Sequence, residues 1–169
     1  DIDLNGGLDM SISVPGAETT GFTLDFRIRD ANSCLTAAST SELVSFDVAV
    51  FRSSYGTSTL LNPDACDGGA ASYDPNYCYP NGVASTTWNL SCTATSTCAS
   101  PLQDYVDYAC TFPLWFVADP TDPGVNIPTA FANDEWSVGI AGTDEALTGP
   151  MSTTSNGVEV ESFSAIDIL

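Results

Sequence analysis

Apolar and polar residues alternate with a period of two along much of this chain, a pattern typical of strands with one buried face. The clearest case is residues 22–29, where Phe, Leu, Phe and Ile alternate with Thr, Asp and two Arg. Residues 43–51 and 135–141 show the same tendency, and residues 8–14 alternate until a Pro-Gly pair ends the run. We therefore predict half-buried strands in these four segments.

Less regular patterns predict three further strands. Residues 83–90 are rich in Thr, and residues 158–168 are apolar with two shifts of parity, which predicts a bulge. Residues 105–117 are aromatic-rich and contain Pro113, which lacks a ladder donor and predicts an edge, a bulge or two short strands. No window has a convincing 3.6-residue stripe, although residues 35–42 would allow one helical turn.

Seven or more strands with polar connections predict an all-β fold, namely an antiparallel two-sheet sandwich. The chain has 169 residues, and no repeat or low-complexity linker divides it, so we predict a single domain over residues 1–169. A long loop insertion is expected at residues 52–82. This segment contains Gly68-Gly69 and two Pro-Asn pairs with turn chemistry.

The composition is strongly acidic and poor in catalytic side chains. There are 22 Asp and Glu residues against three Arg, with no Lys or His, giving a formal net charge of −19. The chain therefore lacks the usual proton shuttle and amine nucleophile, and we expect no enzyme. A glycosidase needs only two carboxylates, and Glu135 beside Trp136 is the one Glu in an apolar setting.

The same composition limits the classes of partner that this protein can bind. Three Arg cannot replace the counterions of nucleic acid or of an anionic membrane surface, so we expect neither as a partner. No run of 18 apolar residues is present, so we expect no membrane insertion. Either Ca²⁺ binding or adaptation to salty surroundings would explain the acidity.

Six cysteines lie between residues 34 and 110. Without a Cys-x-x-Cys pair or any His, zinc binding and an activated thiol are disfavoured, so disulfides in an oxidising compartment are expected. The preferred pairing is Cys66–Cys78, Cys92–Cys98 and Cys34–Cys110. The alternative joins Cys92 and Cys98 to Cys110 and Cys34 instead.

Carboxylates in turn-rich segments are candidate Ca²⁺ ligands, because Ca²⁺ takes six to eight oxygens. The candidates are Asp64, Asp67, Asp74, Asp119 and Asp122, with Asp119 and Asp122 preferred. Turn formation through Asx hydrogen bonds explains the same residues without a metal. No cofactor other than Ca²⁺ is expected.

Aromatic residues are candidates for stacking on sugar rings. Tyr73, Tyr77 and Tyr79 lie in the insertion, where they either bind a glycan or pack the loop onto the sheet. The Trp residues on predicted strands are expected in the core. Asn89 begins the sequon Asn-Leu-Ser and is the candidate glycosylation site.

The C-terminal third carries three sequence motifs. They are Leu-Trp-Phe-Val-Ala-Asp-Pro-Thr-Asp at residues 114–122, Trp-Ser-Val-Gly-Ile at 136–140 and Phe-Ser-Ala-Ile-Asp-Ile at 163–168. These motifs resemble the last strands of immunoglobulin-like sandwich domains in uncharacterised secreted bacterial surface proteins. The resemblance implies an immunoglobulin-like fold and a secreted or cell-surface location. The antibody Cys…Trp…Cys framework is missing, because Trp88 precedes Cys92.

These observations favour two functions. The first is an extracellular structural subunit or module of a cell-surface assembly, such as a filament built by terminal-strand exchange between copies. It is suggested by the apolar segments 8–14 and 158–168, which flank the cysteine-containing region. The partners would be copies of itself or other surface proteins. The alternative is a Ca²⁺-dependent adhesin or carbohydrate-binding module.

Overall fold

The computed structural model describes residues 2–11, 21–29, 45–53, 74–81, 89–96, 100, 102–121, 131, 133–143 and 148–151. Its strands are β1 (Ile2–Leu4), β2 (Phe22–Arg29), β3 (Ser45–Arg52), β4 (Cys78–Pro80), β5 (Ser91–Ala94), β6 (Tyr105–Phe112), β7 (Trp136–Thr143) and β8 (Thr148–Met151). One 3₁₀ turn, η1 (Asn5–Gly7), follows β1.

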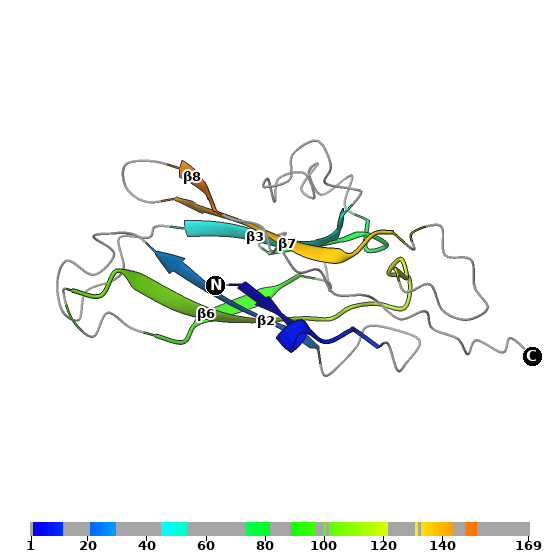
Figure 1. Ribbon diagram of the computed structural model, residues 1–169, viewed down its shortest axis with the longest axis horizontal. Helices are drawn as coiled ribbons and strands as arrows, with labels where there is room; N and C mark the ends of the chain where they lie inside the picture. Colours follow the sequence, from blue (N-terminus) through cyan, green and yellow to red (C-terminus); the bar gives the residue numbers. More distant parts are fainter. Residues whose placement is uncertain are drawn as a thin grey trace, which may run out of the picture.

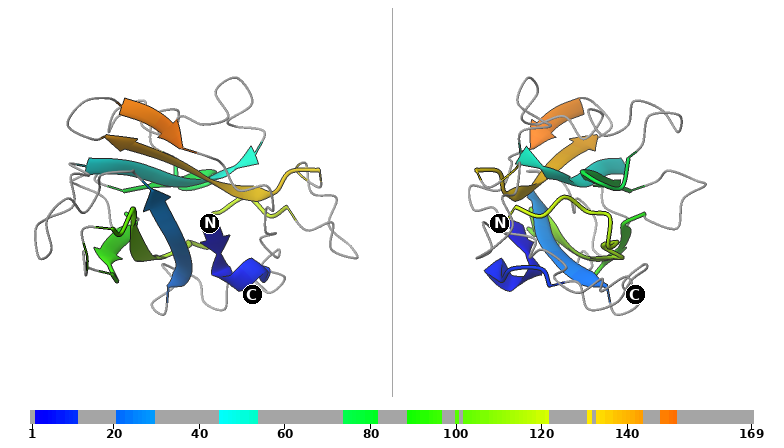
Figure 2. Two further views of the ribbon diagram at one scale, coloured as in Figure 1. Left: turned by 60° about the vertical axis from the view of Figure 1, so that its left-hand side comes forward. Right: turned by 90° about the vertical axis from the view of Figure 1, so that its right-hand side faces the viewer.

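The strands form two four-stranded antiparallel sheets, in the orders β1-β2-β6-β5 and β4-β3-β7-β8. Figure 1 shows the sheets as two stacked layers, with β2 and β6 in one and β3, β7 and β8 in the other. In Figure 2, β2 runs across β3 and β7. The prediction of an all-β, two-sheet antiparallel fold is thus confirmed.

The inner strands follow the alternation of the sequence. In β2, whose bounds match the prediction, Leu24, Phe26 and Ile28 are buried while Thr23 and Asp25 are exposed. In β7, Trp136, Val138 and Ile140 are buried as expected. β6 ends immediately before Pro113, which cannot donate to a ladder.

Aromatic side chains join the two sheets at two places in one shared core. Near the start of β3, Phe46 lies 5.4 Å from Phe26 and 4.6 Å from Tyr108 between ring centroids. Near the end of β3, Tyr79 lies 6.0 Å from Phe112 and 5.8 Å from Trp136. Rings at these separations add to the stabilisation that comes from burial alone.

The N-terminal strand lies earlier than the predicted segment 8–14. β1 begins at Ile2, whereas Leu8 lies outside any strand and is 69% exposed. At Leu8 and Asp9 the predicted strand is absent, because the chain is leaving the turn η1 there, whereas Met10 forms a β-bridge. Met10 is fully buried, and residues 12–14 lie outside the described residues.

The predicted insertion 52–82 is too wide at both ends. Arg52 is the last residue of β3, and Cys78–Pro80 form β4 beside it. The short strands β4, β5 and β8 are not among the predicted ones. Several predicted features lie outside the described residues: the helical turn at 35–42, most of the insertion, the strand region 83–88 and the strand at 158–168.

A disulfide joins Cys92 of β5 to Cys110 of β6, which lie directly opposite each other in the register. The preferred pairing of Cys92 with Cys98 and of Cys110 with Cys34 is therefore wrong, and the alternative is right for this bridge. The two cysteines are 18 positions apart and are brought together by the pairing of β5 with β6. A preference for pairing cysteines that are close in the sequence does not predict this bridge. Cys78 is also disulfide-bonded. Cys34, Cys66 and Cys98 lie outside the described residues.

Candidate functional site

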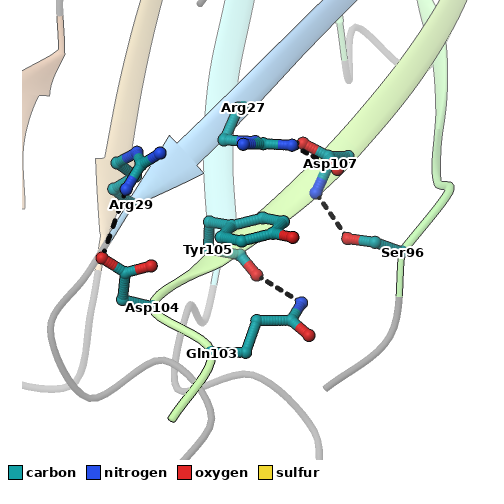
Figure 3. Close-up of polar contacts among 7 residues, drawn as sticks. All are labelled: Arg27, Arg29, Ser96, Gln103, Asp104, Tyr105 and Asp107. Atoms are coloured by element: carbon teal, nitrogen blue, oxygen red, sulfur yellow. Dashed lines mark hydrogen bonds and ion pairs between the residues drawn. The ribbon is translucent and has the colours of Figure 1, made fainter. Parts of the chain in front are cut away.

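The outer face of the first sheet carries a cluster of charged side chains. Because β2 alternates, its arginines point away from the core, and the register sets Arg27 opposite Asp107 and Arg29 opposite Tyr105 on β6. Figure 3 shows these side chains together, with the Tyr105 ring beside Arg27. Two of the three arginines of the chain are therefore gathered on one face.

Arg27 and Asp107 form a two-point ion pair. The Arg27 Nε donates to Asp107 Oδ1 at 2.6 Å, and Nη2 donates to Oδ2 at 3.0 Å. These hydrogen bonds lower the pKa of Asp107 and raise the pKa of Arg27. Asp107 also donates its backbone N–H to Ser96 Oγ at 2.8 Å (Figure 3), which connects β6 to the chain after β5.

Tyr105 provides a flat surface for both arginines. The Cζ of Arg27 lies 3.8 Å from the centre of the ring, and that of Arg29 lies 5.7 Å from it. Arg29 also pairs with Asp104 at 3.3 Å, at a much more exposed position. Each arginine is thus balanced by a carboxylate, so the cluster itself carries little net charge.

A shallow hollow of about 300 Å³ lies beside the ion pair. It is lined by Asp3, Asp25, Phe26, Arg27, Thr95, Asp107 and Tyr108. Asp3 of β1 and Asp25 of β2 are directly opposite in the register, and both are exposed. Because like charges in opposed positions repel, this pair weakens the contact between β1 and β2.

The third arginine, Arg52, lies in a buried ion cluster at the end of β3. Its Nε lies 3.1 Å from Asp119 Oδ2, its Nη1 contacts Asp134 Oδ2, and its Cζ lies 3.7 Å from the centre of the Phe131 ring. Burial raises the pKa of Asp119, although Arg52 acts in the opposite direction. The Trp136 Nε1 donates to the Asp119 carbonyl oxygen at 3.1 Å, so the cluster joins β3, β7 and the chain after β6.

Tyr79 belongs to the core and cannot present its ring to a sugar. Its side chain is fully buried, its hydroxyl donates to the Pro75 carbonyl at 2.7 Å, and the hydroxyl accepts from the Trp115 N–H at 3.1 Å. Burial raises the pKa of this hydroxyl. Its prediction as a ligand-binding residue is therefore wrong. From its place in β4, the ring packs in the core while the hydroxyl links Pro75 and Trp115.

The other candidate aromatic and sequon residues have mixed positions. Tyr77 is half-buried and packs against a small apolar cluster made of Ala49, Phe51 and Cys78. Tyr73 lies outside the described residues, and Asn89 is half-buried. The exposed Glu135 precedes the buried Trp136, so Glu135 does not sit in the apolar setting that its sequence context suggested.

Two of the five proposed Ca²⁺ ligands lie among the described residues, and both have other partners. Asp74 Oδ1 accepts from the Asn76 N–H at 2.9 Å, which is an Asx turn. Asp119 faces Arg52, whose positive charge opposes cation binding there. Within the described residues, no three potential ligands form a metal-binding group. Asp64, Asp67 and Asp122 lie outside these residues.

Patterns in the sequence do not predict the arginine clusters. One signal was available: with 22 carboxylates and three arginines, each arginine should have an acidic neighbour. The identity of that neighbour depends on strand register, since Arg27 and Asp107 are 80 positions apart. Periodicity therefore predicts the exposed face of β2 but not its partners on β6.

Neither a membrane-spanning helix nor similarity to a known protein assigns a function to the described part of this chain. No helix in the described part of the chain is long and apolar enough to cross a membrane. Comparisons with protein-family models, with curated proteins and with solved structures give no significant match to this chain.

Proposed function

We propose that this protein is an extracellular structural module of a cell-surface assembly, in which copies join through strand edges into a filament. The observation that carries the proposal is the edge of the first sheet at β1. In the described part of the chain, β1 is held to β2 by three register pairs, with Leu24, Asp25 and Phe26. A short strand at the edge of a sheet can be replaced by the equivalent strand of another chain.

Two inner strands, β3 and β6, have further cover at their outer edges beyond the paired strands. Beside β3, Asn81 Oδ1 accepts from the Val48 N–H at 2.9 Å, and Asn81 Nδ2 donates to the Phe46 carbonyl at 3.3 Å. Beside β6, Thr95 and Ser96 continue the contacts of β5 by bonding the backbone of Asp107. Side chains and neighbouring loops thus extend the cover of β3 and β6, and we propose the β1 edge of the first sheet as the site of pairing.

The strand order supports an immunoglobulin-like fold for this module. In the order of the chain, β1-β2-β6-β5 facing β4-β3-β7-β8 corresponds to A-B-E-D facing C′-C-F-G. One difference from antibody domains is that the Cys92–Cys110 disulfide lies within a sheet instead of between sheets. We therefore propose an immunoglobulin-like architecture for this chain, without an antibody-like binding loop.

An extracellular location is supported by the cysteines. The Cys92–Cys110 bridge and the bonded Cys78 would persist in an oxidising environment. We propose that the partners are copies of the same chain or other surface proteins.

Electron microscopy of the 169-residue chain at high concentration in 0.15 M salt tests this function. Filaments or regular strings of domains are expected. The proposal fails if only dispersed monomers are seen at every concentration and salt level. Sedimentation velocity on the same samples gives an independent measure of particle size.

The hollow beside Arg27 favours a second candidate function, glycan binding. Carboxylate, guanidinium and hydroxyl groups line it, and all of these can bond sugar hydroxyls. Calorimetry against a panel of glycans, with and without Ca²⁺, separates the two functions. Heat that disappears in the Asp25→Asn variant would support glycan binding at the hollow, and the absence of heat with every glycan would exclude it.

A further inference from the structure

We propose that β1 is an exchangeable arm, which leaves its own β2 and pairs with β2 of a second copy of this chain. This inference rests on the proposed function, since it names the strand and the edge through which copies would join. Three observations carry it: the small and anchored contact of β1, the unusual turn that follows it, and the opposed carboxylates in the β1–β2 pair.

The described contact of β1 with β2 is small but well packed. Leu4 is buried in the core, Ile2 packs against it partly buried, and three register pairs hold the strand. A β1 from another copy would make the same contacts, because both the strand and the edge are identical in the two molecules. Exchange therefore needs no new complementary surface, which is the general basis of domain swapping.

The turn after β1 is suited to act as a hinge. Asn5, Gly6 and Gly7 have successive φ angles of 51°, 66° and 70°, all in the left-handed region. Glycine adopts left-handed and extended backbone about equally well, and Asn tolerates both. The turn lies between two buried residues, Leu4 and Met10, so opening it moves β1 while Met10 keeps the chain fixed to the core.

The carboxylates make release of β1 easier. Asp3 and Asp25 are directly opposite on the exposed face of β1 and β2, and their repulsion opposes docking of the strand. The hydrogen bonds that hold the turn are exposed: Asn5 Nδ2 donates to the carbonyls of Leu8 and Asp9 at 2.9 and 3.3 Å. Both features lower the barrier between the closed and the exchanged forms.

Cross-linking between two variants that each carry one added cysteine, besides the six of the natural chain, tests the exchange directly. D3C and D25C chains are mixed in equal amounts in 0.15 M salt, partly unfolded and refolded together, and then mildly oxidised. Exchange is expected to give a dimer band on non-reducing gels, with peptide mapping joining position 3 of one chain to position 25 of the other. A mixture without this cross-link overturns the proposal.

Two further samples serve as controls, one for a negative and one for a positive result. The D3C/D25C double variant, diluted as a monomer, should form the bond within one chain, which shows that the two positions are close enough to react. A D3C and T93C mixture is the matched control, since Thr93 is exposed on β5 of the same sheet but two strands away from β2. Equal cross-linking in this control would mean random collision and would overturn the exchange.

A hinge variant distinguishes a turn that acts as a hinge from a turn that only stabilises the fold. A Cβ at Gly6 meets no atom within 4 Å, so Gly6→Ala changes only the preference of the backbone. Because an alanine disfavours the left-handed turn but not an extended hinge, G6A should raise the exchanged fraction about five-fold. Lower stability without more exchange would contradict the role of this turn as a hinge.

The outcomes separate the exchange from the proposed function. Filaments together with the D3C–D25C cross-link support both. Filaments without the cross-link keep the structural function and overturn exchange of β1. Cross-linked dimers without filaments support the exchange and overturn the filament.

Discussion

The three arginines are the chain's only side chains with a permanent positive charge, and their surroundings differ. The side chain of Arg52 is 11% exposed between Asp119 and Asp134, whereas that of Arg29 is 60% exposed beside Asp104. Removing one member of a buried ion cluster leaves its partners as uncompensated buried charges. The local environment, and not the number of ion pairs, should therefore decide what each arginine contributes.

We expect Arg52→Met to lower the free energy of unfolding by about 3 kcal/mol. The two carboxylates that face Arg52 would lose their counter-charge in a site with little water. Urea denaturation followed by tryptophan fluorescence measures the loss. Arg29→Met is the matched control and should cost less than about 1 kcal/mol, as exposed pairs do. Equal losses in the two variants would contradict a special role for the buried cluster.

Asp107 and Asp119 should affect the pH dependence of stability with opposite signs. The pKa of Asp107 is lowered by its hydrogen bonds to Arg27, so its stabilisation is complete above the unfolded pKa of about 3.9 and is lost as the pH falls through the lower folded value. The pKa of Asp119 is raised by burial, so its contribution falls as the pH rises above about 3.9.

Unfolding curves between pH 2.5 and 7 at low ionic strength check both signs. Asp107→Asn should flatten the loss of stability in acid. Asp119→Asn should make stability rise more steeply as the pH increases above the unfolded pKa of about 3.9, because the wild-type carboxyl, with its raised pKa, opposes that rise. A change in the same direction for both variants would show that the two carboxyls are not in the surroundings described here.

The disulfide acts at the scale of a single strand pair, because it ties the short edge strand β5 to β6. It spans 18 positions, and closing a loop of this length stabilises a fold by about 3 kcal/mol in the chain-entropy model. We expect the Cys92→Ala and Cys110→Ala double variant to lose that amount in urea denaturation. Thr93→Ala, on the same strand, should change stability by less than about 0.5 kcal/mol. A loss below 1 kcal/mol in the double variant would mean that β5 does not need the bridge.

The inner strands could be predicted from the sequence and the outer strands could not. The inner strands β2, β3, β6 and β7 have eight residues each, long enough for the alternation of buried and exposed side chains to be visible. The outer strands have three or four residues, and in β5 only Cys92 is even half-buried. An edge strand of this length is defined by its partner, which periodicity does not report.

Two candidate residues, Tyr79 and Asp119, have structural roles for a related physical reason. Turn formers surround Tyr79 and predict a loop, yet pairing of β4 with β3 carries its ring into the core. Asp119 lies in a turn-rich acidic segment, which predicts a metal ligand, yet the fold brings it to Arg52, 67 positions earlier in the chain. Both errors come from long-range register, whereas the disulfide residues themselves could be recognised from composition.

At the scale of the whole molecule, the acidic surface controls whether copies can approach each other. The 19 net charges share a surface of 9138 Å², about 480 Å² for each, which corresponds to a spacing of roughly 20 Å. The Debye length is about 30 Å in 10 mM salt and about 8 Å in 0.15 M salt. Neighbouring copies therefore repel through many charges in dilute buffer, and through few in salt.

Self-association should consequently strengthen by at least about ten-fold between 10 mM and 0.5 M NaCl, as measured by sedimentation velocity at fixed protein concentration. Screening weakens the repulsion between copies, and also that between Asp3 and Asp25 where β1 docks. MgCl₂ at equal ionic strength is the control: a much larger effect would indicate divalent ions bridging carboxylates instead of general screening. Unfolding measured in the same buffers separates stabilisation of the fold from association. Association that is unchanged or weaker in salt would contradict an assembly limited by charge, because screening should remove most of the repulsion between copies.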